Sequence, residues 1–209
     1  GDVRASLAGA ASSINAVYEV PFLAHMTMEP MNCTALFKDG QCTVWTGHQD
    51  ADWIAKIAAK ILDIQLDKVN VITPFLGGGF GRRANNDYVV QAVSIAKKLP
   101  GQPIKLIWSR EEDIQHDFYR PKILASFQAG FDSEGNPTAY RHLNIGDGGQ
   151  RQQGLASHAP ALMDSAVNQP YDIPNKSIEY LFEEIPIPVG FWRSVSGAHN
   201  GFFIESFVD

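Results

Sequence analysis

The chain has 209 residues, with 17 basic and 23 acidic side chains, so its formal net charge is -6 at pH 7. This charge argues against binding to nucleic acid or to anionic membranes. No apolar run approaches the roughly 18 residues of a membrane span, and we expect no signal peptide because no basic segment precedes an apolar one. Hydrophobic residues make up 44% of the chain, which is enough for one large core or two small ones.

A strand and a hairpin are the first predicted elements. Residues 14–20 alternate loosely in polarity and predict a strand. Further on, Asp39-Gly40 stands between apolar runs, which is the strongest short-range signal for a hairpin. A two-residue loop there pairs Phe37 with Cys42. Cys33 then lies about four residues from Cys42 along the strands, too far for a disulfide, so we expect two free thiols in the core.

Two helices and two strands follow in the first half. Asp50 is a plausible N-cap for an amphipathic helix through Leu62, whose expected core side includes Trp53. Residues 69–72 predict a short strand, residues 86–98 a second helix, and residues 104–108 a buried strand.

The second half is richer in strands. Residues 123–131 and 138–145 predict a hairpin, and residues 177–182 predict a further strand. Residues 147–154 are polar and rich in Gly and Gln, which predicts a loop. After Arg193 the pattern is helical up to Asp209, and this helical end suggests that the sequence is a fragment.

The most informative motif is the glycine segment 77–83, Gly-Gly-Gly-Phe-Gly-Arg-Arg, which follows a strand and precedes a helix. Glycines let consecutive N–H groups converge on an anion, and Arg82 with Arg83 would add positive potential. The segment lacks the ending of a P-loop, and the dinucleotide fingerprint fits only weakly because residues 99–105 lack the expected acidic side chain. We prefer the hypothesis that the segment is a backbone cradle for an anion. The alternative is a turn that only packs the strand against the helix.

Other chemistry-bearing side chains are expected to have structural roles. The six histidines show no spacing of a metal site, and no Gly-x-Ser-x-Gly nucleophile motif is present. Glu111, Glu112 and Asp113 are typical of a solvated helix start, and Met26 with Met28 is typical of a core.

Three segments together resemble the large subunit of the molybdenum hydroxylases, the xanthine dehydrogenase and aldehyde oxidase family. They are Met-Glu-Pro-x-Asn-Cys-Thr-Ala at 28–35, the glycine segment at 77–83, and Gly-Phe-Trp-Arg-Ser-Val at 190–195. The double arginine and the last segment look most like the isoquinoline 1-oxidoreductase β-subunit branch, which includes bacterial membrane-associated aldehyde dehydrogenases.

The resemblance implies an α+β fold, with mixed sheets and packed helices, in which residues 1–209 are a fragment of the molybdopterin-binding region. The alternative domain organisation is a division of the chain near 110–120, into residues 1–115 and 116–209. The implied activity is hydroxylation of an N-heteroaromatic or oxidation of an aldehyde, with water as the oxygen source. The open alternatives are a non-redox nucleotide- or anion-binding module and a structural subunit.

The resemblance also implies site residues. The substrate pocket would include Phe80 and Leu162, no side chain would bind the metal directly, and the general-base glutamate would lie outside this chain, since Glu205 stands in the wrong motif. Ala84 and Leu162 replace the residues that recognise purines, so an apolar heteroaromatic or an aldehyde fits better. The implied cofactor-binding residues are Gly78, Gly79, Phe80, Gly81, Arg82 and Arg193.

The implied cofactor is molybdopterin cytosine dinucleotide with molybdenum. The implied partners are a small subunit with [2Fe–2S] clusters and a cytochrome as electron acceptor, besides a small-molecule substrate. A bacterial source is implied, while periplasm and cytoplasm both stay open as compartments.

Overall fold

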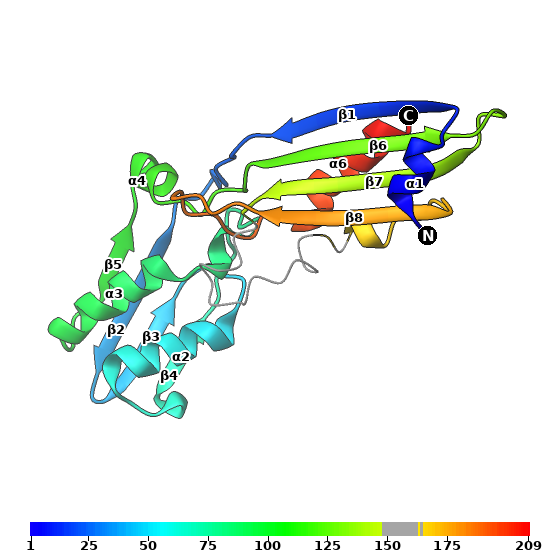
Figure 1. Ribbon diagram of the computed structural model, residues 1–209. Coiled ribbons are helices and arrows are strands. Elements are labelled where there is room, and N and C mark those ends of the chain that lie inside the picture. The colour runs from blue at the N-terminus through cyan, green and yellow to red at the C-terminus, as the bar shows by residue number, and fades with distance from the viewer. Residues whose placement is uncertain (148–162, 164) are drawn as a thin grey trace. The chain divides into compact units, whose positions relative to one another are not determined.

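The computed structural model describes residues 1–147, 163 and 165–209, and the chain divides there into two compact units. One unit comprises residues 24–118, and the other comprises residues 1–23 together with 119–209. Both are mixed sheets with packed helices, which confirms the predicted fold class (Figure 1). The boundary considered near 110–120 lies at one of the two crossings between units. The crossing at residue 23 was not predicted, and it arises because the first long strand pairs with a strand beyond residue 119.

The unit of residues 24–118 contains a four-stranded sheet in the order β4-β3-β2-β5. Its strands β3 and β4 are parallel, and helix α2 connects them, whereas the other neighbouring strands are antiparallel. Its elements are β2 (Asn32–Lys38), β3 (Gln41–Trp45), α2 (Ala51–Leu62), η1 (Leu66–Lys68), β4 (Val69–Ile72), η2 (Arg82–Ala84), α3 (Asp87–Lys98), β5 (Ile104–Ile107) and α4 (Arg110–Gln115).

The hairpin between β2 and β3 has the predicted register, with Phe37 opposite Cys42. Asp39 and Gly40 both have positive φ, at 50° and 73°, as a two-residue hairpin loop requires. Cys33 and Cys42 are buried and free, as predicted. Burial raises the pKa of Cys33 to about 12 and that of Cys42 to about 11, so both thiols are inert at neutral pH.

Helices α2 and α3 pack their apolar sides on this sheet and form its core. Asp50 caps α2 by accepting the N–H of Trp53, as predicted. Trp53 itself is 53% exposed and not in the core, because the buried stripe runs through Ile54, Ala58 and Leu62, one residue further along. The predicted strand near 104–108 is present, but it is an edge strand, so Ile107 is 61% exposed and only Trp108 is buried.

The second unit contains a four-stranded sheet in the order β1-β6-β7-β8. The predicted β6–β7 hairpin is confirmed, and β7 and β8 are parallel. Figure 1 shows α1 and α6 on opposite faces of this sheet. The elements are α1 (Val3–Ala8), β1 (Ser12–Val20), β6 (Ile123–Phe131), β7 (Pro137–Gly146), β8 (Asn175–Phe182) and α6 (Ser196–Val208).

Buried polar groups run through the core between β7 and α6. His142 Nε2 lies 2.7 Å from Asn144 Oδ1, and Asn144 Nδ2 donates to Asn200 Oδ1 at 2.7 Å. The ring of His142 stacks on Phe127, with centroids 4.2 Å apart. Together with His199, which is 4% exposed, these side chains form a polar layer inside an otherwise apolar core.

Part of the predicted loop 147–154 and all of Leu162 lie outside the described residues. Among the described residues, no helix is long and apolar enough to cross a bilayer.

Candidate functional site

The glycine loop lies between β4 and α3, after the end of β4 at Ile72. Its backbone has positive φ at Gly78 (99°), Phe80 (55°) and Gly81 (108°). Glycine adopts such values at little cost, but Phe80 is in a conformation that residues with side chains rarely take. Strained residues of this kind concentrate at binding sites, so Phe80 marks the loop as a candidate site.

The N–H groups of the loop fall into two sets. Those of Gly77, Gly81 and Arg82 are bonded within the unit, to Glu29 Oε2, Gln49 Oε1 and Gly79 O. Those of Gly78, Gly79 and Phe80 have no acceptor within the described part of the chain. Three consecutive unpaired N–H groups are suited to an anion or to an oxygen atom of a ligand.

Gln49 belongs to this site, although the sequence analysis did not identify it. Its Oε1 accepts the N–H of Gly81 at 3.0 Å, and a Cβ at Gly79 would lie only 2.6 Å from the same oxygen. Gln49 follows the end of β3, and β4 is the parallel neighbour of β3. The ends of adjacent parallel strands meet at one edge of a sheet. A prediction that β3 and β4 are parallel neighbours would therefore have placed Gln49 beside the loop.

Arg83 is fully buried beneath the loop. Its guanidinium donates to the carbonyl oxygens of Gly78 at 2.9 Å, Gly47 at 3.0 Å and Glu29 at 3.0 Å. It also pairs with the carboxylate of Glu29 at 2.9 Å. The guanidinium is therefore saturated by the protein itself.

Arg82 is also buried, at 1% exposure. Its guanidinium forms two hydrogen bonds with Asp87, at 2.8 and 3.0 Å, and its Nε lies 3.2 Å from Asp117 Oδ1. The rings of Trp108 and Phe118 lie 5.4 and 5.3 Å from its guanidinium carbon. Both arginines thus point into the unit and are neutralised by carboxylates, which differs from the expected positive potential at the loop.

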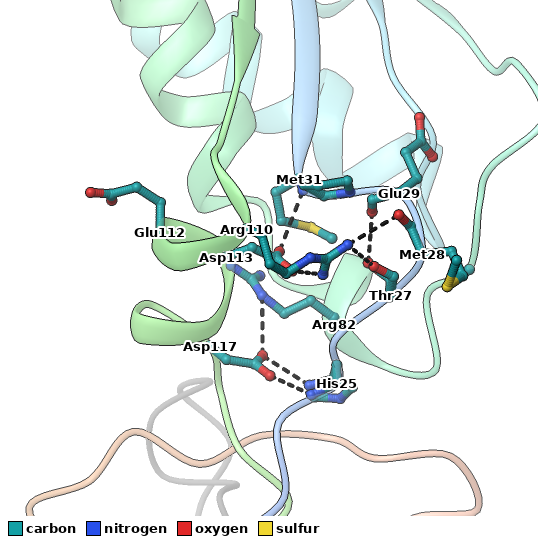
Figure 2. Close-up of polar contacts among 12 residues, drawn as sticks. His25, Thr27, Met28, Glu29, Met31, Arg82, Arg110, Glu112, Asp113 and Asp117 are labelled. Carbon is teal, nitrogen blue, oxygen red and sulfur yellow. Dashed lines mark hydrogen bonds and ion pairs between the residues drawn. The ribbon is translucent and has the colours of Figure 1, made fainter.

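A polar network continues from Arg82 toward residues 25–31, as Figure 2 shows. Asp117 lies 2.9 Å from His25 Nδ1, and both side chains are 1% exposed. Asp113 is 3% exposed and accepts from Met31 N–H and from Arg110, at 3.4 and 2.7 Å. Burial is the largest cause that raises the pKa of Asp113. The prediction of a fully solvated helix start was therefore wrong for Asp113, because it caps the backbone of a neighbouring segment.

The two methionines of this segment are not in the core, contrary to prediction. Met26 is 60% exposed and Met28 is 89% exposed. Arg110 binds the carbonyl oxygens of Thr27 and Met28, at 2.5 and 3.0 Å, so the backbone faces the protein and the side chains face outward.

The remaining predicted site residues have separate positions. Phe80 is 45% exposed. Arg193 belongs to the other unit, where its exposed guanidinium has no hydrogen bond or ion pair to the described residues. Glu205 accepts a hydrogen bond from the Tyr171 hydroxyl at 2.6 Å. No group of three His, Cys, Asp or Glu side chains in the described ranges is arranged to hold a metal ion.

We predict that Gly78→Ala destabilises its unit by about 2 kcal/mol, because the new Cβ would have a positive φ and would lie 2.9 Å from the Phe80 ring. Gly40→Ala is the matched control, since Gly40 also has positive φ but has no atom within 4 Å of the added Cβ. Urea unfolding of both variants measures the difference. Equal decreases in the free energy of unfolding of the two variants would show that the contact with Phe80 does not contribute to the loss of stability.

A mixed α/β fold with a strained glycine loop and unpaired backbone N–H groups is suited to an anionic ligand or cofactor. Comparison with known families shows the family of the chain. Residues 1–209 match the family described as molybdopterin cofactor-binding domain, and the chain belongs to this family.

Individual relatives agree with this family. The chain is 31% identical over 142 residues to the aldehyde oxidoreductase molybdenum-binding subunit PaoC of Escherichia coli (strain K12), covering 68% of this chain and 19% of that protein. It is 28% identical over 231 residues to isoquinoline 1-oxidoreductase subunit beta of Brevundimonas diminuta, covering 99% of this chain and 29% of that protein. The chain thus spans less than a third of the length of these relatives.

A solved structure shows the same fold. Quinoline 2-oxidoreductase from Pseudomonas putida 86 superimposes with a TM-score of 0.76 at 19% identity, over 93% of this chain and 25% of that one.

Proposed function

We propose that this chain forms the part of a molybdenum-dependent oxidoreductase subunit that holds molybdopterin, and that the glycine loop is its contact with the cofactor. The observation that carries the proposal is the set of unpaired N–H groups of Gly78, Gly79 and Phe80. Oxygen-rich anionic groups are the natural acceptors for such donors. A Cβ at Gly78 or Gly79 would lie under 3.0 Å from a neighbouring side chain, so the close packing of the loop favours glycine at both positions.

Each predicted residue has a part in this proposal. Gly81 and Arg82 would fix the loop, through the hydrogen bonds to Gln49 and to Gly79 O. Arg193 would contact cofactor oxygens, which suits an exposed guanidinium that lacks a partner among the described residues. Phe80, half-exposed beside the donors, would form a wall of the substrate pocket, as would Leu162.

When bound, the molybdenum centre supplies the redox chemistry by which an aldehyde or N-heteroaromatic carbon is hydroxylated with oxygen from water. The chain's own contribution is to bind and orient the cofactor and to provide an apolar contact for the substrate through Phe80. The general base, a glutamate by resemblance, would come from outside these residues.

The finer assignments are also proposals. We infer the cytosine dinucleotide form of the cofactor and an electron path through [2Fe–2S] clusters on a small partner subunit, with a cytochrome as acceptor. The names of the relatives, a molybdenum-binding subunit and a subunit beta, support the presence of partner subunits.

Metal and nucleotide analysis of the protein expressed with its genomic neighbours tests this function. We expect about one molybdenum atom per chain and release of a cytidine nucleotide on acid hydrolysis. Arg193→Ala should lower molybdenum retention by about tenfold, the order typical for a residue that supports a metal centre. Arg4→Ala, at another exposed arginine of the same unit, should leave retention unchanged.

Absence of molybdenum from the wild type, with its partners present, would contradict the proposal. The second candidate would then be a non-redox anion-binding module, which the same unpaired N–H groups favour. In that case a nucleotide or phosphate should bind to the wild type in calorimetry, and Gly78→Ala should weaken this binding.

A further inference from the structure

Arg83 connects three segments that are far apart in the sequence. Its Nε donates to Gly78 O in the glycine loop, its Nη1 donates to Gly47 O after β3, and its Nη2 donates to Glu29 O. All three segments contribute to the candidate site described above. One guanidinium is therefore the point at which their backbones are held together.

The chemistry of this contact is specific for arginine. Arg83 is 0% exposed, so its charge and its N–H groups must be satisfied by the protein. Four carbonyl oxygens, including that of Pro30 at 3.5 Å, and one carboxylate surround the planar fork, a geometry that a lysine ammonium does not match. The Tyr88 hydroxyl also donates to Gly47 O, at 3.1 Å, and the Tyr88 ring lies 5.9 Å from the Arg83 guanidinium carbon.

Glu29 completes the arrangement at the start of the loop. Its Oε2 accepts from Arg83 Nη2 at 2.9 Å and from the Gly77 N–H at 2.8 Å, while its Oε1 accepts from Asn32 at 2.9 Å. A Cβ at Gly77 would lie 2.5 Å from Glu29 Cβ, so the two backbones are in close contact. The loop is thus fixed at Gly77 by Glu29, at Gly78 by Arg83 and at Gly81 by Gln49.

We propose that Arg83 and Glu29 are positioning residues, which hold the Gly78, Gly79 and Phe80 N–H groups in the orientation that binds the molybdopterin cofactor. The fixed points lie immediately before, within and after the three free donors. Because the donors are ordered before the ligand arrives, binding has no loop-ordering cost to offset. This inference rests on the proposed function, since it takes the cofactor as the ligand.

Two measurements on the native holoprotein test the inference. The first is amide hydrogen exchange at Gly77, Gly81 and Arg82, whose N–H groups are bonded within the site and report on the order of the loop. The second is the dissociation rate of molybdenum and pterin. We expect Arg83→Lys to accelerate exchange selectively at these amides and to accelerate cofactor dissociation by about tenfold or more.

Glu29→Gln is the second variant, in case Arg83→Lys does not fold. In this variant Arg83 loses the charge of Glu29 but keeps its carbonyl acceptors, and the Glu29 side chain is 36% exposed, so both measurements should shift in the same direction by a smaller factor. The matched controls are Arg141→Lys and Glu179→Gln. These residues form a partly exposed Arg–Glu ion pair, with hydrogen bonds of 2.8 and 2.7 Å, in the other unit, and both measurements should stay unchanged in these variants.

The outcomes separate the inference from the function on which it rests. Unchanged exchange at the three loop amides would overturn the positioning role, and so would accelerated exchange with an unchanged rate of cofactor loss. Exchange that rises equally across α3 and β2 would also overturn it, since that pattern indicates a general loss of stability. A wild type without molybdopterin would instead contradict the proposed function, and the inference would fall with it.

Discussion

Replacement of Asp117 by asparagine is expected to destabilise the unit of residues 24–118 by about 3–5 kcal/mol, the cost of removing one partner from a buried ion pair. Asp117 is 2% exposed, and its carboxylate binds His25 Nδ1, the His25 N–H and the Phe118 N–H. It also lies 3.2 Å from Arg82 Nε. Without its charge, Arg82 would keep only Asp87 as a charged partner, and the segment at His25 would lose its anchor.

The control for this prediction is Asp87→Asn. Asp87 contacts the same guanidinium through two hydrogen bonds, but its side chain is 31% exposed, so water can replace part of the interaction. A loss of about 1 kcal/mol is expected there. Hydrogen exchange of the α3 and β2 amides measures the free energy of opening for this unit. Losses of similar size in the two variants would contradict the assignment of Asp117 as the central anchor.

The second large effect is a loss of stability of the other unit in mild acid. Burial is the main cause that lowers the pKa of His142 to about 4, against a smaller opposing effect of the bond to Asn144. The pKa of His199 is also about 4, lowered first by burial and then by the charges of Arg120 and His142. In the unfolded chain both imidazoles titrate near pH 6.5.

The direction of the pH effect follows from these values. Between pH 6.5 and 4 the unfolded chain binds protons that the folded unit does not, so the stability decreases as pH falls. Each histidine contributes about 1.4 kcal/mol per pH unit in this window, or about 2 kcal/mol between pH 6.5 and 5. Above about pH 7.5 neither histidine contributes to the pH dependence, because the imidazoles are then neutral in the unfolded chain as well.

Hydrogen exchange of the β6 and β7 amides, measured between pH 7 and pH 5, tests this prediction with the intrinsic exchange rates taken into account. His142→Gln removes one titrating group and retains a donor for Asn144, so it should remove about half of the pH dependence. The quantity to compare is the slope of stability against pH and not the stability itself, because the substitution also changes packing against Phe127. An unchanged slope in His142→Gln would mean that His142 is protonated in the folded unit.

The sequence by itself determined most elements and the presence of the loop. Local signals were sufficient for the β2–β3 hairpin, where Asp39-Gly40 requires positive φ at two successive positions, and for α2, where Asp50 caps an apolar periodicity. The consecutive glycines also predicted a backbone cradle for an anion, which stays a prediction; the structure shows that the N–H groups of Gly78, Gly79 and Phe80 have no acceptor in the described part of the chain.

Only the tertiary structure decided what surrounds that loop. Arg82 and Arg83 were expected to add positive potential at the loop, but whether a guanidinium points outward depends on carboxylates and carbonyls from distant segments, here Glu29 and Asp117. Gln49 was missed, and Asp113 was misassigned, for the same reason. Local periodicity indicates which backbone conformation a residue adopts. Its partners depend on the strand order, which brings together segments that are 32 and 82 residues apart in the sequence.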